Sequence, residues 1–380
     1  MRYLSSTAYR RFRSARFVSV AIGLVLAFGP IGCSDSLAPE PADAHADRII
    51  FLSSRGYVGD FFTNARYDIY SMNADGSDLE NLAESLGVYA DLQATPDGRS
   101  LIFATWNAAD GLPDGDCPYQ IWSMATDGSQ QRRLTTGDCH GAPRMSPDGN
   151  RVAYISTTTR SIHVANIDGS APRDVSVALP PVSHGCSPEP KWDVGIIGWA
   201  SSNRVVFSRH ICGAGTTVYS ADINGNGLVT HDFVINDIFV SPDGSRVAYW
   251  SGGQLMVTLA DGSDPRILAS GVIRANGEHL ARPWSPDGTR LIYRKNDGIH
   301  IVDMDGIDVQ MPTYPELRFD ASFCAWSPDG NRLVFTVYER DTGGTITGTN
   351  LYLVNLDGSG VVNLTRQSGS LNYSAVWVRR

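Results

Sequence analysis

The 380-residue sequence lacks the charge balance that nucleic-acid binding requires. It holds 31 basic and 40 acidic residues, a formal net charge of −9. The first 33 residues carry five arginines and no acid, so the remainder holds 26 basic and 40 acidic residues, a net charge of −14. Phosphate binding needs clustered Lys and Arg, so we expect no nucleic-acid partner.

The N-terminal region lacks an apolar run long enough for an ordinary membrane-spanning helix. Its run covers twelve residues, 17–28, which suits the apolar region of a signal peptide. The segment Gly29-Pro30-Ile31-Gly32-Cys33 follows and resembles the lipobox of bacterial lipoproteins. The resemblance implies that Cys33 is lipidated, and the serine after it favours the outer membrane. An ordinary secretory peptide or an uncleaved anchor is the alternative.

Several catalytic and metal-binding signatures are also absent. The sequence has no G-x-S-x-G, H-E-x-x-H or phosphate-binding G-x-x-x-x-G-K-[ST] motif, and no C-x-x-C pair. Residues 34–47 hold two prolines and little to bury, so we interpret them as a flexible tether. The functional content is therefore expected in residues 48–380.

A repeated β-turn is the dominant positive feature of residues 48–380. Proline pre-sets φ at the first central position, aspartate can bond nearby backbone, and glycine takes the left-handed position. An arginine often follows, and we expect it to pair with a turn aspartate. The five clear copies are Thr95-Pro96-Asp97-Gly98, Met145-Ser146-Pro147-Asp148-Gly149, Val240-Ser241-Pro242-Asp243-Gly244, Trp284-Ser285-Pro286-Asp287-Gly288 and Trp326-Ser327-Pro328-Asp329-Gly330.

The repeat predicts an all-β, seven-bladed β-propeller of four-stranded blades. Seven aligned positions recur at gaps of 40 to 54 residues, with no helical stretch between. Each unit has a second turn, which is aspartate-glycine in six units and Asn224-Gly225 in the other. The chain begins with a strand of the kind that follows a Pro-Asp-Gly turn, and it ends with a strand of the kind that precedes one. The last strand, around Trp377, is therefore expected to complete the first blade beside Arg48. The recurring tryptophans, including Trp284 and Trp326, are expected between blades.

These repeats resemble the Trp-Ser-Pro-Asp-Gly propeller repeats of the TolB-like family over residues 48–380. The resemblance implies the fold and leaves the function open, because such propellers serve as scaffolds, binding modules and parts of enzymes. Both tight turns of each blade lie on one face, and the long connections lie on the other. Binding is expected on the loop-rich face.

The cysteines follow this division of faces. Cys117 and Cys139 fall in neighbouring loops of the loop-rich face, as do Cys186 and Cys212. Two disulfides are therefore expected in an oxidising envelope compartment. Cys324 is expected to be a buried free thiol.

Five residues are candidates for a binding rim at the channel mouth. They are Tyr89, His140, His184, His279 and Asp320. Histidines there can hold a metal or act as a general base, and TolB-like polysaccharide lyases use channel histidines, which keeps an enzyme as the alternative.

A weaker metal candidate lies in a predicted turn. Asp222, Asn224 and Asn226 resemble the first half of a calcium-binding loop, but Phe233 stands where that loop has its glutamate. We favour a plain hairpin at this position.

We expect a non-enzymatic, lipid-anchored propeller of the bacterial cell envelope, facing the periplasm or the surface. It would act as a monomeric domain without a cofactor and bind an envelope protein or a glycan. The alternative is a metal-assisted polysaccharide lyase or hydrolase, with calcium or a transition metal as cofactor. A propeller that serves a separately encoded peptidase is a third possibility.

Overall fold

A computed structural model describes residues 47–55, 67–106, 119–137, 139–179, 194–211, 215–231, 238–273, 282–312, 321–366 and 369–379. Side chains of residues 84–90, 106, 211 and 321–324 are excepted. These residues lie in one compact unit, Asp43–Arg380. Its described part consists of strands and turns, and it contains no helix that could cross a membrane.

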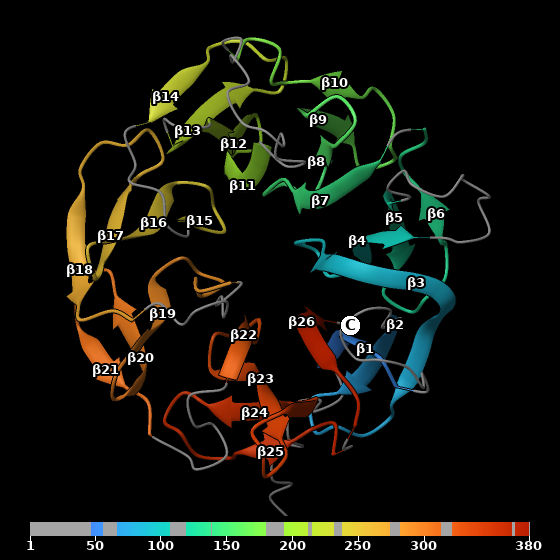
Figure 1. Cartoon of the computed structure of the whole chain (residues 1–380), viewed down its shortest axis with the longest axis vertical. Coiled ribbons are helices and arrows are strands. Elements are labelled where there is room, and N and C mark those ends of the chain that lie inside the picture. Colours follow the sequence, from blue (N-terminus) through green and yellow to red (C-terminus); the bar gives the residue numbers. More distant parts are fainter. Residues whose placement is uncertain are drawn as a thin grey trace, which may run out of the picture. The chain divides into compact units, whose positions relative to one another are not determined.

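The strands of this unit form seven antiparallel blades arranged in a ring, as predicted (Figure 1). β3 serves two blades, since its first residues pair with β2 and its last residues pair with β4. Blade 1 consists of β26 (Asn372–Arg379), β1 (Asp47–Ser53), β2 (Tyr67–Asn73) and the start of β3 (Glu80–Ala94). Blade 2 consists of the end of β3, β4 (Ser100–Trp106), β5 (Tyr119–Ala125) and β6 (Arg132–Arg133). Blade 3 consists of β7 (His140–Met145), β8 (Arg151–Ser156), β9 (Ser161–Asn166) and β10 (Arg173–Asp174).

The remaining four blades follow in chain order. In blade 6 an isolated bridge between Trp284 and Leu291 stands in place of the innermost strand. Blade 4 consists of β11 (Val194–Ser201), β12 (Arg204–Ile211), β13 (Gly215–Asp222) and β14 (Val229–His231), and blade 5 of β15 (Ile238–Val240), β16 (Arg246–Ser251), β17 (Gln254–Leu259) and β18 (Arg266–Ser270). Blade 6 contains β19 (Arg290–Lys295), β20 (Gly298–Asp303) and β21 (Asp308–Gln310). Blade 7 consists of β22 (Ala321–Trp326), β23 (Arg332–Arg340), β24 (Ile346–Asn355) and β25 (Val362–Asn363).

The last strand closes the ring, which confirms the prediction from the phase of the repeat. β26 pairs antiparallel with β1, with Arg48 opposite Val378. Asn372 at the start of β26 is fully buried and joins two blades. Its Oδ1 accepts a 2.7 Å bond from Ser53 Oγ in blade 1, and its Nδ2 donates a 2.6 Å bond to the carbonyl oxygen of Thr349 in blade 7. Closure therefore removes the exposed edges that the first and last strands would otherwise present.

The repeated turn is held by its own side chains. In the copy at Ser285 to Gly288, the serine hydroxyl donates to Asp287 Oδ1 at 2.5 Å. The same carboxylate oxygen accepts the backbone N–H of Thr289 at 3.0 Å, and the serine oxygen accepts that of Arg290 at 2.9 Å. Gly288 has φ +67°, the left-handed value that the turn requires. The predicted turn chemistry is correct, and the serine and aspartate side chains of this turn bond to each other and to the backbone of the turn.

The tryptophans lie between blades, as predicted. Trp199, Trp284 and Trp326 are at most 6% exposed. Trp284 Nε1 donates to the carbonyl oxygen of Phe239 in the preceding blade at 3.0 Å, and Trp199 makes the equivalent bond of 2.9 Å to Arg144. The indoles of Trp199 and Trp284 therefore satisfy their N–H groups inside the interfaces that they fill.

The arginine after the turn differs from expectation at Arg290. Its Nη2 donates to the carbonyl oxygen of Gly330 in the next blade at 2.9 Å, and its guanidinium lies 5.3 Å from the ring centroid of Trp326. A turn carbonyl and an aromatic face replace the expected turn aspartate, because the arginine side chain is long enough to reach the neighbouring blade. Arg332 likewise reaches the next blade, at Asp47 and over the ring of Trp377. Arg151 keeps the expected contact with its turn aspartate, 4.0 Å from Asp148.

Candidate functional site

The predicted rim falls largely outside the described residues. His184, His279 and Asp320 lie outside them, as does the side chain of Tyr89 in β3. His140 begins β7 and is 8% exposed. Its Nδ1 lies 3.4 Å from Gln120 Oε1 and its ring packs edge-on against Tyr154, with 5.2 Å between centroids. His140 is thus packed between blades 2 and 3, and a role for the other rim residues stays a prediction.

The calcium-like segment forms the turn between β13 and β14. Asp222 Oδ1 accepts the backbone N–H groups of Asn226, at 2.9 Å, and Asn224, at 2.8 Å, and these bonds lower the pKa of the carboxyl. The Asn224 side chain accepts a bond from Arg173 of blade 3. These are the contacts of a hairpin, and within the described ranges no group of three or more His, Cys, Asp and Glu is placed to hold a metal.

One predicted disulfide cysteine lies in the described part of the chain. Cys139 is buried and disulfide-bonded. Cys33, Cys117, Cys186 and Cys212 lie outside the described residues, so both pairings stay predictions.

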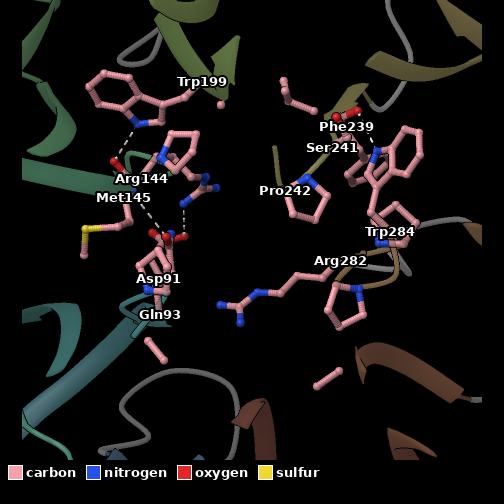
Figure 2. A pocket seen from close by; sticks show the side chains of 18 of the residues that line it. Asp91, Gln93, Arg144, Met145, Trp199, Phe239, Ser241, Pro242, Arg282 and Trp284 are labelled. Atoms are coloured by element: carbon pink, nitrogen blue, oxygen red, sulfur yellow. Dashed lines mark hydrogen bonds and ion pairs between the residues drawn. The ribbon is translucent and has the colours of Figure 1, made fainter. Parts of the chain in front are cut away.

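A cavity of about 740 Å³ occupies the centre of the ring (Figure 2). Its walls are the innermost segments of the seven blades, where residues just before each repeated turn face the centre. A second cavity of about 490 Å³ is lined by turn residues, by the end of β26 and by Arg282. The described part of the channel is therefore hollow toward the turn-bearing face.

β-Bulges shape the walls of this cavity. The pairing of the innermost strand shifts register in blades 1, 2, 3, 4 and 7. In blades 1 to 3 the extra segment includes a non-glycine residue with left-handed φ, namely Ser374 at +53°, Asp91 at +62° and Ala142 at +50°. A bulge inserts one residue and re-aims the side chains around it. Asp91 and Ser374 consequently line the cavity.

One ion pair crosses from blade 2 to blade 3 on the cavity wall. Arg144 Nη1 lies 3.1 Å from Asp91 Oδ1, and both side chains are about one-third exposed. The same nitrogen donates to the carbonyl oxygen of Pro143 at 2.8 Å. Gln93 joins the same blades, since its Nε2 donates to the Pro143 oxygen at 2.6 Å and its Oε1 accepts the N–H of Met145 at 3.2 Å. This wall is rigid and internally bonded.

Arg282 enters the cavity from blade 6. Figure 2 shows it reaching from the side of Trp284 toward that of Gln93 and Asp91, and its Nη2 donates to the carbonyl oxygen of Leu92 at 2.5 Å. The side chain is solvent-accessible, yet the blades surround it. This desolvation, with the charge of Arg144, lowers the pKa of Arg282 to about 10 against the opposing effect of Asp91. Arg282 is therefore still cationic at neutral pH, and its side chain remains accessible to solvent in the channel.

The sequence did not single out these channel residues. Asp91, Arg144 and Arg282 lie one to three residues before the aligned repeat positions Ala94, Met145 and Trp284. Polar residues at these offsets in otherwise apolar strands were the available signal. Strand alternation alone could not place them, because the bulges change which side of the strand faces the channel.

No family model matches the chain, and no curated protein matches its sequence. Among solved structures it is similar to an oligogalacturonate lyase in complex with manganese, with 13% identity, a TM-score of 0.47 and coverage of 63% of this chain and 73% of that one. It is also similar to TolB from Acinetobacter baumannii, with 16% identity, a TM-score of 0.47 and coverage of 83% and 79%. For a nidogen/laminin complex the values are 10%, 0.43, 87% and 98%. Likenesses this remote are compatible with unrelated functions on one fold.

Proposed function

We propose that this chain is a non-enzymatic binding scaffold of the bacterial cell envelope, which holds a protein or glycan partner on a rigid propeller. The observation that carries the proposal is the central cavity of about 740 Å³. Ligand sites are typically concave and preformed, with a few polar groups in a mostly apolar lining. Arg282 and Arg144 supply such groups. Arg282 is held by the carbonyl oxygen of Leu92 in blade 2, and Arg144 by that of Pro143 in its own strand.

Two surfaces of the scaffold are open to a partner under this proposal. One is the channel with its turn-lined mouth, where the described cavities lie. The other is the loop-rich face, with Tyr89, His184, His279 and Asp320 as candidate contacts. The turn networks use their own polar groups internally, which leaves the channel as the part of the turn-bearing face suited to recognition.

Partner capture from envelope extract tests the scaffold function. Residues 34–380 would be immobilised, and each captured component would be repurified and titrated against the free protein by calorimetry. We expect a saturable partner with one site per chain. Absence of any saturable partner would contradict the proposal. Cleavage of a uronate polymer by the purified protein, seen as ultraviolet absorbance of an unsaturated product, would favour the lyase alternative instead.

The anchoring part of the proposal rests on Cys33. Cys33→Ala should abolish incorporation of labelled palmitate and release the protein from the membrane fraction, since the lipid supplies the membrane affinity. Cys324→Ala is the matched control and should leave both unchanged. Unaltered palmitate incorporation in Cys33→Ala would contradict lipidation at this residue.

A further inference from the structure

The central cavity is electropositive although the chain is acidic. Among the described residues, the charged ones that line it are Asp91, Arg144 and Arg282, one negative and two positive. The chain as a whole has a formal net charge of −9. Low-dielectric walls strengthen the interaction of such a local charge with a ligand. The cavity therefore favours an anion over a neutral or cationic ligand.

The two guanidinium groups keep hydrogen-bond donors available. A guanidinium carries five N–H donors, and Arg282 uses Nη2 toward Leu92 as its bond within the described part of the chain. The bonds of Arg144 to described residues engage Nη1, toward Asp91 and Pro143. Planar guanidinium groups bind carboxylates through paired, charge-assisted hydrogen bonds. Two of them face one cavity whose described lining contains a single carboxylate, that of Asp91.

The rest of the lining offers little to a sugar. The hydroxyls of Ser146 and Ser241 donate to the turn carboxylates of Asp148 and Asp243, both at 2.6 Å. Gln93 is engaged on both sides of its amide. The prolines at the turns and the side chains of the inner strands make the remaining surface largely apolar. A glycan would leave most of its hydroxyls unpaired there, which costs affinity.

The tryptophans of the lining are also unsuited to sugar stacking. Trp199 and Trp284 line the cavity but are 3% and 5% exposed. Their rings are packed between blades and present no open face to the channel. A ligand with one carboxylate and an otherwise apolar surface matches the lining better than a polyhydroxylated chain does.

We propose that the channel binds a short peptide segment through a carboxylate held by Arg282 and Arg144, with apolar peptide side chains against the proline-lined mouth. This inference rests on the proposed scaffold function and specifies the chemistry of its partner. The carboxylate belongs either to a Glu or Asp side chain or to a peptide C-terminus. Asp91 acts as the internal counter-ion that an entering carboxylate displaces from Arg144.

Calorimetric titration with synthetic apolar hexapeptides tests the inference. One peptide is acetylated and amidated with a single central Glu, a second has Gln in its place, and a third has Gln and a free C-terminal carboxylate. We expect the Glu or the free-acid peptide to bind at least about tenfold more tightly than the neutral one, because charge-assisted bonds are lost without the carboxylate. The two acidic arms identify the source of the carboxylate.

Three variants make the test specific to the channel. Arg282→Gln should weaken acidic-peptide binding by about tenfold or more. Asp91→Asn should tighten it, because the internal counter-ion is removed and asparagine tolerates the left-handed conformation. Arg266→Gln, on the exposed outer strand β18, makes the same charge change and should leave binding unaltered.

The outcomes separate this inference from the scaffold function. Equal binding of acidic and neutral peptides, or preference for trigalacturonate over both, overturns the peptide proposal. If a captured envelope partner binds wild type and Arg282→Gln equally, the scaffold function stands and the channel inference falls. If acidic peptides bind through Arg282 while envelope extract yields no saturable partner, the channel inference stands and the scaffold function falls.

Discussion

Arg282 of blade 6 donates a 2.5 Å hydrogen bond to the carbonyl oxygen of Leu92 in blade 2, 190 residues earlier in the chain. The bond holds a cationic side chain across the channel. Arg48 shows the contrasting case of an arginine used for structure. It is 2% exposed, and its guanidinium donates to Ser71 Oγ at 2.6 Å and to the Asp78 carboxylate at 2.6 Å.

Replacing these two arginines should have different effects on stability. Arg282→Met should change the free energy of unfolding by less than about 1 kcal/mol, since it removes one hydrogen bond of a solvent-accessible side chain. Arg48→Met should cost about 2 kcal/mol, because buried Ser71 loses its partner while the half-exposed carboxylates of Asp78 and Glu80 regain water. Urea unfolding measures both. A larger loss for Arg282→Met than for Arg48→Met would contradict this assignment of roles.

Ring closure should depend strongly on Asn372. Asn372→Ala leaves Ser53 Oγ and the Thr349 carbonyl oxygen buried without these partners, at a cost of about 3 kcal/mol in the free energy of unfolding. Asn166→Ala removes an exposed bond to Ser170 within one turn and should cost less than about 1 kcal/mol. Thermal unfolding of both variants gives the comparison. Similar losses in the two variants would show that Asn372 does not secure the closure.

The repeated turn should make stability fall in acid. Burial pushes the pKa of Asp287 upward, but hydrogen bonds from Ser285 and Thr289 outweigh it and hold that pKa below its usual value. The pKa of Asp97 is lowered first by Thr95 and then by the backbone of Arg99. Because the folded pKa lies below the unfolded value of about 3.9, these groups stabilise the fold above that pH. This contribution is lost as pH falls through the folded pKa.

Urea unfolding between neutral pH and about pH 2.5 measures how far the free energy of unfolding falls in acid. In Asp287→Asn the free energy of unfolding should fall less steeply with decreasing pH, since one carboxylate with a lowered pKa is removed. Asp264→Asn is the control, because its exposed side chain makes none of the turn bonds. An equal change in slope for both variants would exclude the turn network as the cause.

The predicted disulfides are testable on the intact protein. Non-reducing peptide mapping should recover Cys139 linked to Cys117, and Cys186 linked to Cys212, with Cys324 free. Cys117→Ser should lower the melting temperature by several degrees, since the crosslink restrains the unfolded chain. Cys324→Ser provides a cysteine replacement outside the pairs. Recovery of Cys139 linked to any cysteine other than Cys117 would refute this pairing.

Local chemistry is sufficient to predict the fold of this protein. The turn at Ser285 to Gly288 closes through bonds within six residues, so its proline, aspartate and glycine specify it wherever the segment lies. The phase of the repeat predicted that the strand around Trp377 pairs beside Arg48, because a free strand edge is unfavourable at either end. The inter-blade tryptophans followed from their single position in the repeat.

The channel required the tertiary structure. Bulges at Asp91 and Ala142 change which side chains face the centre, and the alternation of residues along a strand does not predict these bulges. The proximity of Arg282 to Leu92 depends on how seven blades close, since the two residues lie on different blades. His140, a rim candidate by position, proved to be packed against Tyr154. Repetition and turn chemistry are local and readable in order along the chain, whereas the site is made from residues that only the closed ring brings together.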